Sequence, residues 1–258
     1  MRKSLVSVCA IAALSSFAGA ETIEIEFENL LPSGGTAFTP VFFGLHDGGF
    51  DLFSSGETAS SALEQVAELG ATGDLEALFG GSAGTGAFGT TSGGPITGGN
   101  STSLSLDVLD PTSERFLTFA SMVVPTNDLF IGNGNQLAYE LFDAAGNFNG
   151  PVTIEIFGSN VYDAGTEVNN ADDGAAFLQG IDGTAGTAQN GTVQLFFSDP
   201  NSGDYLDSLL GRTTAPGFDI ESTFGSATPI ARITVVPTPG ALAGLAVCGL
   251  MVRRRRRA

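Results

Sequence analysis

The chain has no tryptophan, one histidine (His46) and only two cysteines in its 258 residues. Both cysteines, Cys9 and Cys248, lie near the chain ends, so the long middle of the chain has no thiol with which to form a disulfide. One histidine in a cysteine-free middle argues against a zinc site, because zinc in proteins is held mainly by histidine and cysteine. The absence of tryptophan also removes a common stacking surface for sugars. Stability must come from a packed core or from bound ions.

Basic residues are scarce as well. Residues 21–236 hold all 28 acidic residues but only Arg115, Arg212 and Arg232, a formal charge of −25. A surface of this sign repels phosphate backbones, so we expect no nucleic-acid partner. It favours cations. The 42% of apolar residues and the 20 phenylalanines are enough for a core, which excludes wholesale disorder and fits one domain.

The N-terminal residues 1–20 have the pattern of a secretory signal peptide. Two basic residues precede an apolar stretch, and Ala18-Gly19-Ala20 supplies a small-residue cleavage pattern. We therefore expect the mature chain to begin near Glu21. The alternative is a buried N-terminal helix.

The C-terminal residues 237–258 combine a proline motif, an uncharged run and five arginines. The run 240–252 has 13 residues and would reach roughly 20 Å as a helix, short of a hydrocarbon core of roughly 30 Å. The three parts in this order resemble the PEP-CTERM sorting signal of Gram-negative bacteria, which implies an exosortase-like partner in the inner membrane. Thr238 stands where the usual motif has Glu, which leaves the sorting enzyme open. A nucleic-acid-binding arginine tail is the alternative, but an apolar run directly before it argues otherwise.

The middle of the chain reads as strands. In 21–31, Ile23, Ile25 and Phe27 alternate with threonine and glutamates, the period of a half-buried strand. One segment, 60–69, has helical spacing and a stop at Gly70. The pattern predicts an all-β fold, an antiparallel β-sandwich with one or two short helices. Further strands are expected at 38–45, 103–109, 116–124, 136–142, 152–157, 192–197 and 230–236, and 80–99 is expected to be a glycine-rich loop.

Several glycine motifs match catalytic patterns without their context. Residues 80–84 satisfy G-x-S-x-G, but no strand-to-helix setting surrounds them, and His46 precedes the serine. Residues 84–89 satisfy G-x-G-x-x-G without a βαβ unit. Paired carboxylates among the 28 acids leave a secreted hydrolase of extracellular polysaccharide as an alternative.

Four phrases in order resemble the spondin N-terminal domain, a family of secreted β-sandwich modules. They are the segments 38–53, 56–70, 119–132 and 162–167, and the resemblance spans residue 21 to about 236. It implies a calcium ion held by an acid after the Pro-x-x strand end and by two acids of an Asp-Ala-Gly-Thr-acid loop. Those acids are Asp128, Asp163 and Glu167. The family often has Asp at the last position, and Glu167 keeps the carboxylate while adding one methylene.

The residues themselves agree with this set. Asp128 follows an apolar strand and Asp163 ends another, so two strand ends are expected to converge at one rim. Gly165 permits the loop to fold back, and Asn127 and Asn169 are candidates to complete a shell of six to eight oxygens. Acids gathered without a local lysine repel one another unless a cation intervenes. The alternative is that all three are ordinary loop acids.

The sequence therefore predicts a secreted, surface-sorted, calcium-binding adhesion or matrix module without catalytic activity. Its expected partners are calcium and an extracellular polysaccharide or a surface protein. The expected route runs through the inner membrane and periplasm of a Gram-negative bacterium, with membrane contact only through the C-terminal segment before processing. Six side chains are predicted to point between the two sheets: Phe27, Phe42, Leu106, Phe119, Ile154 and Ile233.

Overall fold

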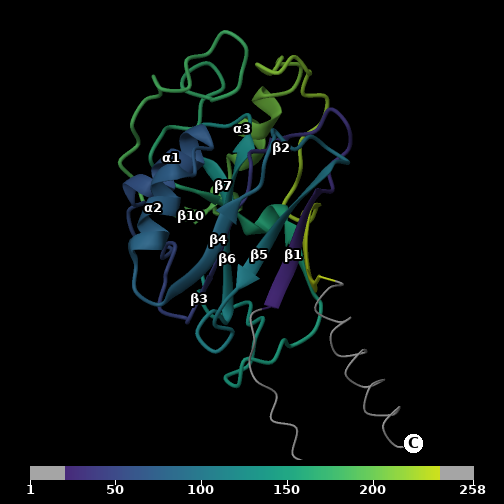
Figure 1. The fold of residues 1–258 in the computed structure, drawn as a ribbon. Coiled ribbons are helices and arrows are strands. Elements are labelled where there is room, and N and C mark those ends of the chain that lie inside the picture. Colours follow the sequence, from purple (N-terminus) through teal and green to yellow (C-terminus); the bar gives the residue numbers. More distant parts are fainter. Residues whose placement is uncertain (1–20, 239–258) are drawn as a thin grey trace, which may run out of the picture.

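The computed structural model describes residues 21–238, and the predictions made for 1–20 and 239–258 lie outside the described residues. Two antiparallel sheets form a β-sandwich, which confirms the predicted fold class (Figure 1). One sheet has four strands in the order β5-β1-β11-β8; the other has seven, with β10-β9-β7-β6-β3-β4 as its path and β2 paired to β6. Three short α-helices are present in 21–238, one more than the upper expectation.

The elements have the following bounds. The strands are β1 Glu21–Asn29, β2 Ala37–Phe38, β3 Phe42–His46, β4 Thr85–Thr90, β5 Ser101–Val108, β6 Phe116–Val124, β7 Leu129–Gly132, β8 Val152–Phe157, β9 Val161–Asp163, β10 Gln194–Leu195 and β11 Pro229–Pro237. The helices are α1 Ser61–Leu69, α2 Gly73–Gly81 and α3 Ser202–Ser208, with 3-10 turns η1 Gly158–Asn160 and η2 Phe196–Ser198.

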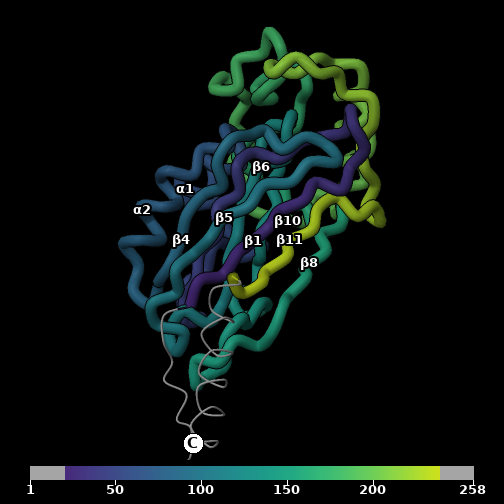
Figure 2. The backbone as a smooth tube through the Cα atoms, turned by 45° about the vertical axis from the view of Figure 1, so that its right-hand side comes forward, coloured from purple at the N-terminus to yellow at the C-terminus, as the bar shows by residue number. Residues whose placement is uncertain are grey.

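The four-stranded sheet follows the alternation of its sequence. Ile23, Ile25 and Phe27 of β1 are fully buried, whereas the intervening residues lie on the outer face. Strand β1 pairs with both β5 and β11, and Phe27 lies opposite Ile233 of β11. Figure 2 shows the four strands side by side. One apolar face on each strand is what closes the core against the second sheet.

The seven-stranded sheet is covered on both faces. Every residue of β6 is buried, because one face meets the four-stranded sheet and the other meets α1 and α2. Helix α1 begins after Ser60, whose side chain accepts the Leu63 N–H at 3.2 Å, and ends at Gly70 in the left-handed region (φ +65°). Both helix boundaries match the sequence prediction.

The helix layer corrects one facing assignment. Phe42 is fully buried but packs with the helices, and its ring meets Phe79 of α2 edge to face at 5.4 Å. The other five side chains predicted for the inter-sheet core lie there. Both faces of β3 are apolar. The alternation of its side chains therefore shows which residues share a face, but not which face meets the other sheet.

The glycine-rich stretch is more ordered than predicted. Residues 80–99 include the end of α2 and the whole of β4, which pairs with β3. Gly44 of β3 makes room for the helix above it, because a Cβ there would lie 2.6 Å from the ring of Phe79. Burial of Phe79 against β3 stabilises the segment that the composition alone had marked as a loop.

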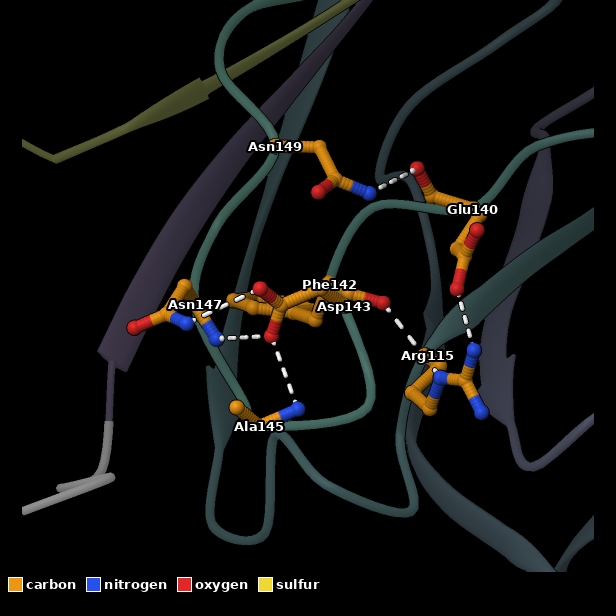
Figure 3. A network of polar contacts seen from close by, with 7 residues as sticks. All are labelled: Arg115, Glu140, Phe142, Asp143, Ala145, Asn147 and Asn149. Atoms are coloured by element: carbon orange, nitrogen blue, oxygen red, sulfur yellow. Dashed lines mark hydrogen bonds and ion pairs between the residues drawn. The ribbon is translucent and has the colours of Figure 1, made fainter.

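The segment 136–142 was predicted to be a strand and is a loop instead. It makes two isolated bridges, from Glu140 to Phe116 and from Phe142 to Phe148. Polar contacts hold it in place (Figure 3). Arg115 pairs with Glu140, while Asp143 accepts the N–H groups of Ala145 and Asn147 at 2.8 and 2.9 Å and closes a turn. Backbone bonds such as that from the Leu141 N–H to the Arg115 carbonyl at 2.7 Å remain, and side-chain bonds to the backbone close the following turn.

The two ends of the described chain lie together. Thr238 donates its N–H to the carbonyl of Thr22 at 3.0 Å, and Ile23 pairs with Pro237. In Figures 1 and 2 both ends leave at the bottom of the sandwich, whereas the long loops after β9, coloured green, form the opposite end. No helix within 21–238 has the length and apolar character needed to cross a membrane.

Candidate functional site

Two strand ends meet at the end of the seven-stranded sheet that lies away from residues 21 and 238 (Figure 1). Asp128 comes directly before β7, and Asp163 is the last residue of β9. Strand β9 pairs with β7 so that Asp163 lies opposite Leu129, and Ala164 donates its N–H to the Asp128 carbonyl at 3.2 Å. This register brings together two acids that are 35 positions apart in the sequence.

Asp128 is fully buried, and its two carboxylate oxygens have different surroundings. Oδ2 accepts the N–H groups of Thr166 and Glu167 at 2.8 and 3.1 Å and the Thr166 hydroxyl at 3.2 Å. Oδ1 has no hydrogen-bond partner in residues 21–238. An unsatisfied acceptor of a buried carboxylate is costly, since burial removes its water without replacing it.

Asp163 opens the loop that contributes those donors. Its Oδ1 accepts the Gly165 N–H at 2.8 Å, and its Oδ2 accepts the Asn169 amide at 2.6 Å. Gly165 has φ +69°, and a Cβ there would lie 2.6 Å from the Thr192 backbone, so glycine is required for this turn. The amide oxygen of Asn169 is buried and, like Asp128 Oδ1, has no partner in the described chain.

Glu167 joins the site through its backbone more than through its side chain. Its N–H bonds to Asp128, but its carboxylate accepts the Asn127 amide at 3.2 Å. That carboxylate is packed against Gly174 and Gly186, where a Cβ would collide with it. The structure thus groups Asp128 with Asp163 and directs the Glu167 carboxylate toward Asn127.

Tyr205 is a member of the site that the sequence did not indicate. It lies on α3 and is almost completely buried. Its hydroxyl accepts the Asn127 N–H at 3.0 Å and donates to Asn127 Oδ1 at 2.8 Å. Asn127 in turn contacts Glu167. No local sequence pattern connects Tyr205 with Asn127, which lies 78 positions earlier.

Burial makes the ionised acids unfavourable here. Burial first, and then the charge of Asp163, raise the pKa of Asp128 to about 7. Burial also raises the pKa of Asp163, and it raises that of Glu167 to about 7. The pKa of Tyr205 is raised by burial and by the three acid charges around it. Such shifts are what desolvation and like charges produce without a compensating cation.

A cleft of about 230 Å³ opens beside Asp163. Oxygen-bearing side chains line much of it, including Asn169, Asp199, Asn201 and Tyr205. Oxygen donors of this kind suit a hard cation such as calcium. No group of three or more His, Cys, Asp or Glu side chains within 21–238 is arranged to hold a metal, so the three predicted acids do not form a complete ligand cluster in this structure.

The catalytic motifs do not assemble. Ser82 follows α2 and donates its hydroxyl to the Leu78 carbonyl at 2.7 Å. His46 is buried, and its Nδ1 accepts the Gly48 N–H at 3.0 Å. No hydrogen bond joins Ser82 to His46 within the described chain, so the arrangement needed to activate a serine is lacking there.

Comparison with known proteins finds one family. The model described as Spondin_N matches residues 23–198, which include all three predicted site acids and most of both sheets. No curated protein matches the chain.

Proposed function

Because the chain belongs to the Spondin_N family, we propose that it is a secreted, surface-sorted module that binds calcium and acts in adhesion or in a matrix rather than in catalysis. Membership of this family indicates an extracellular β-sandwich module. Calcium binding, sorting and the non-catalytic role are the further parts of the proposal.

One observation carries the calcium proposal. Asp128 Oδ1 and Asn169 Oδ1 are buried acceptors without partners in 21–238, and both belong to the group around Asp163. Each unpartnered group of this kind costs about 1–3 kcal/mol, more when charged. These two oxygens and the Asp163 carboxylate would hold the ion, and backbone carbonyls or waters in the adjoining cleft would complete its shell. The residues therefore fit calcium.

A bound calcium ion would have a structural role, through its positive charge and its links between two segments, and not a catalytic one. It would offset the repulsion between Asp128 and Asp163 and tie the start of β7 to the loop after β9. Glu167 remains a predicted ligand. Its hydrogen bond to Asn127 makes it the outer member of the set.

The position of the site suits a surface module. Both ends of the described chain leave at one pole, and the loops after β9 lie at the other (Figure 1). We propose that residues 1–20 direct export and that the PEP-CTERM-like segment 237–258 is handled by an exosortase-like enzyme in the inner membrane of a Gram-negative bacterium. The calcium site would then face away from the point of attachment.

Calcium titration of the exported protein tests the proposal. Extracellular modules bind calcium with dissociation constants on the order of 10⁻⁴ to 10⁻³ M. Because only the folded state assembles the site, calcium at about 100 times its dissociation constant should stabilise the protein by about 2.7 kcal/mol. We expect the melting temperature to rise with calcium, to rise less with magnesium, and to fall with a chelator.

Two variants make the test specific. Asp163→Asn should fold and lose most of the calcium-dependent shift, because an amide oxygen carries no full charge. Asp74→Asn, which removes an exposed acid of α2, should keep it. Equal melting of wild type and Asp163→Asn with and without calcium would rule out the site.

A further inference from the structure

A second cleft lies where the two sheets come together at the edge formed by β8. Its volume is about 280 Å³, and its lining comes from β6, the end of β7, the loop 133–139, β8, η1 and β9. Two of the three tyrosines of the chain, Tyr139 and Tyr162, are in this lining. It shares no lining residue with the cleft beside Asp163.

The ring of Tyr162 is fixed by its neighbours. It stacks on Phe130 with ring centroids 5.7 Å apart and meets Phe53 edge to face at 4.7 Å. Its hydroxyl comes close to Gly134, where a Cβ would lie 3.2 Å from the oxygen. A side chain at position 134 would therefore press on the hydroxyl, and glycine keeps this part of the cleft open.

The two phenol hydroxyls have free hydrogen-bonding capacity. Neither Tyr139 nor Tyr162 makes a side-chain hydrogen bond to any residue in 21–238, although burial raises the pKa of both. Both tyrosines belong to the lining of the same cleft. Each is a donor and an acceptor toward a ligand.

Of the three asparagines in the lining, Asn133 is held by structural bonds to Thr118, Phe119 and Leu117, whereas Asn135 and Asn160 keep amino groups that are free within 21–238. Asn135 uses its oxygen to accept the Leu137 N–H at 3.0 Å, and Asn160 accepts the Phe157 N–H at 2.9 Å. The amino groups of both asparagines make no such structural bond into the cleft wall. Phe119 and Ile156 lie at the floor of the cleft and are only 2% and 3% exposed.

Charge narrows the class of ligand. Glu155 is in the lining and lies 3.4 Å from Arg232, which also pairs with Glu28 at 2.9 Å, so one net negative charge remains at this group. The carboxylate and the charge of −25 on residues 21–236 would repel an anionic ligand. The tyrosine hydroxyls and the amide amino groups of the lining suit a neutral group rich in hydroxyls.

We propose that this cleft binds one sugar unit of a neutral extracellular saccharide, with the Tyr139 and Tyr162 hydroxyls bonding to sugar hydroxyls. The volume lies just below the usual range for small-molecule sites, about 300–1,000 Å³, which suits one ring rather than a longer segment. The proposal rests on the proposed function in one respect, because the adhesion role suggests an extracellular saccharide as the partner. It does not depend on the calcium site.

Tyrosine fluorescence can test this proposal, because the chain has few aromatic fluorophores. The chain has no tryptophan and three tyrosines, so tyrosine emission reports on Tyr139, Tyr162 and Tyr205 alone. The exported protein is titrated with cellotetraose, laminaritetraose, maltotetraose and N-acetylated chitotetraose, with tetragalacturonate as an anionic probe. Binding is measured by calorimetry and by tyrosine emission. We expect at least one neutral probe to bind with a dissociation constant of about 1 mM or tighter, and tetragalacturonate not to bind.

Hydroxyl-deleting variants locate the binding. Tyr139→Phe and Tyr162→Phe keep both rings, and each should weaken binding about two- to tenfold, with a larger loss in the double variant. Ser103→Ala, on the exposed side of β5, should change nothing. Failure of all four neutral probes, preference for the anionic probe, or unchanged affinity in the double variant would overturn the proposal.

The same double variant separates this proposal from the calcium site. It retains only Tyr205, which lies among the acids, so its emission should still respond to calcium. If the wild-type protein binds sugar but neither protein responds to calcium, calcium binding is ruled out and the sugar-binding proposal stands. A calcium response without sugar binding would do the reverse.

Discussion

Asp163 lies opposite Leu129 across β7 and β9, and this register sets its carboxylate near that of Asp128 in the same buried region. The charge of Asp163 contributes to the raised pKa of Asp128. Two acids are thus held together by the backbone pairing of their strands, not by a bond between them. A cation is the simplest group that would lower the free energy of this arrangement.

The first prediction concerns Asp128. In Asp128→Asn the amide oxygen can still accept the Thr166 and Glu167 N–H groups, while the buried negative charge is removed. We expect the calcium-free variant at pH 7 to melt at or above the temperature of wild type and to respond little to calcium. Differential scanning calorimetry with and without a chelator measures both. A wild-type calcium shift in this variant would show that Asp128 is not a ligand.

The second prediction separates Glu167 from the two aspartates. Because its carboxylate bonds to Asn127, we expect Glu167→Gln to keep more of the calcium-dependent shift than Asp163→Asn does. Calcium titration of both variants by calorimetry compares them. An equal loss would instead establish Glu167 as a direct ligand.

The third prediction concerns His46, the only histidine. Burial lowers its pKa, and the neighbouring Asp47 raises it only in part. A histidine whose pKa is lower in the folded than in the unfolded state contributes to the stability of the fold at pH values above its unfolded pKa of about 6.5. That contribution is lost as the pH falls toward the folded pKa. Proton NMR of the single imidazole should give a pKa below 6.5. His46→Gln should lack this part of the pH dependence of melting, and an imidazole pKa above 6.5 would contradict the assigned burial.

The fourth prediction concerns the core. Phe27 is fully buried between the sheets and meets Phe38 edge to face at 5.2 Å. Phe27→Ala should lower the free energy of unfolding by about 3–5 kcal/mol, because it removes apolar contact and leaves a cavity. Phe42→Ala should cost a similar amount, although Phe42 faces the helices. Val168→Ala, at a side chain 41% exposed, should change it by at most about 0.5 kcal/mol. Urea unfolding measures all three.

The fifth prediction concerns processing. Strand β1 begins at Glu21, directly after the predicted cleavage site. Intact-mass measurement on protein released from the cell surface should find a chain that begins near Glu21 and lacks the segment beyond Pro239. Recovery of the five terminal arginines would contradict the sorting prediction.

Local patterns determined the elements whose residues carry their own signal. Strands β1, β6 and β8 have alternating or continuous apolar runs, and α1 has Ser60 and Gly70 at its ends, so each was predicted with bounds close to those observed. The same reasoning failed for 136–142, where isolated bridges and a few backbone bonds take the place of a regular strand. It also failed for β4, whose glycines have no strand preference of their own.

Only the tertiary structure decided which faces and which acids meet. Phe42 faces α2 because the helices cover the second face of the sheet, a fact that no period of two contains. Asp128 and Asp163 could be nominated by resemblance, but the β7–β9 register makes them neighbours. The same packing brings Tyr205 close to the acids and places Tyr139 and Tyr162 in the lining of one cleft. Sequence periodicity specifies how one strand divides its own side chains, whereas contacts between distant segments depend on pairing and packing over the whole chain.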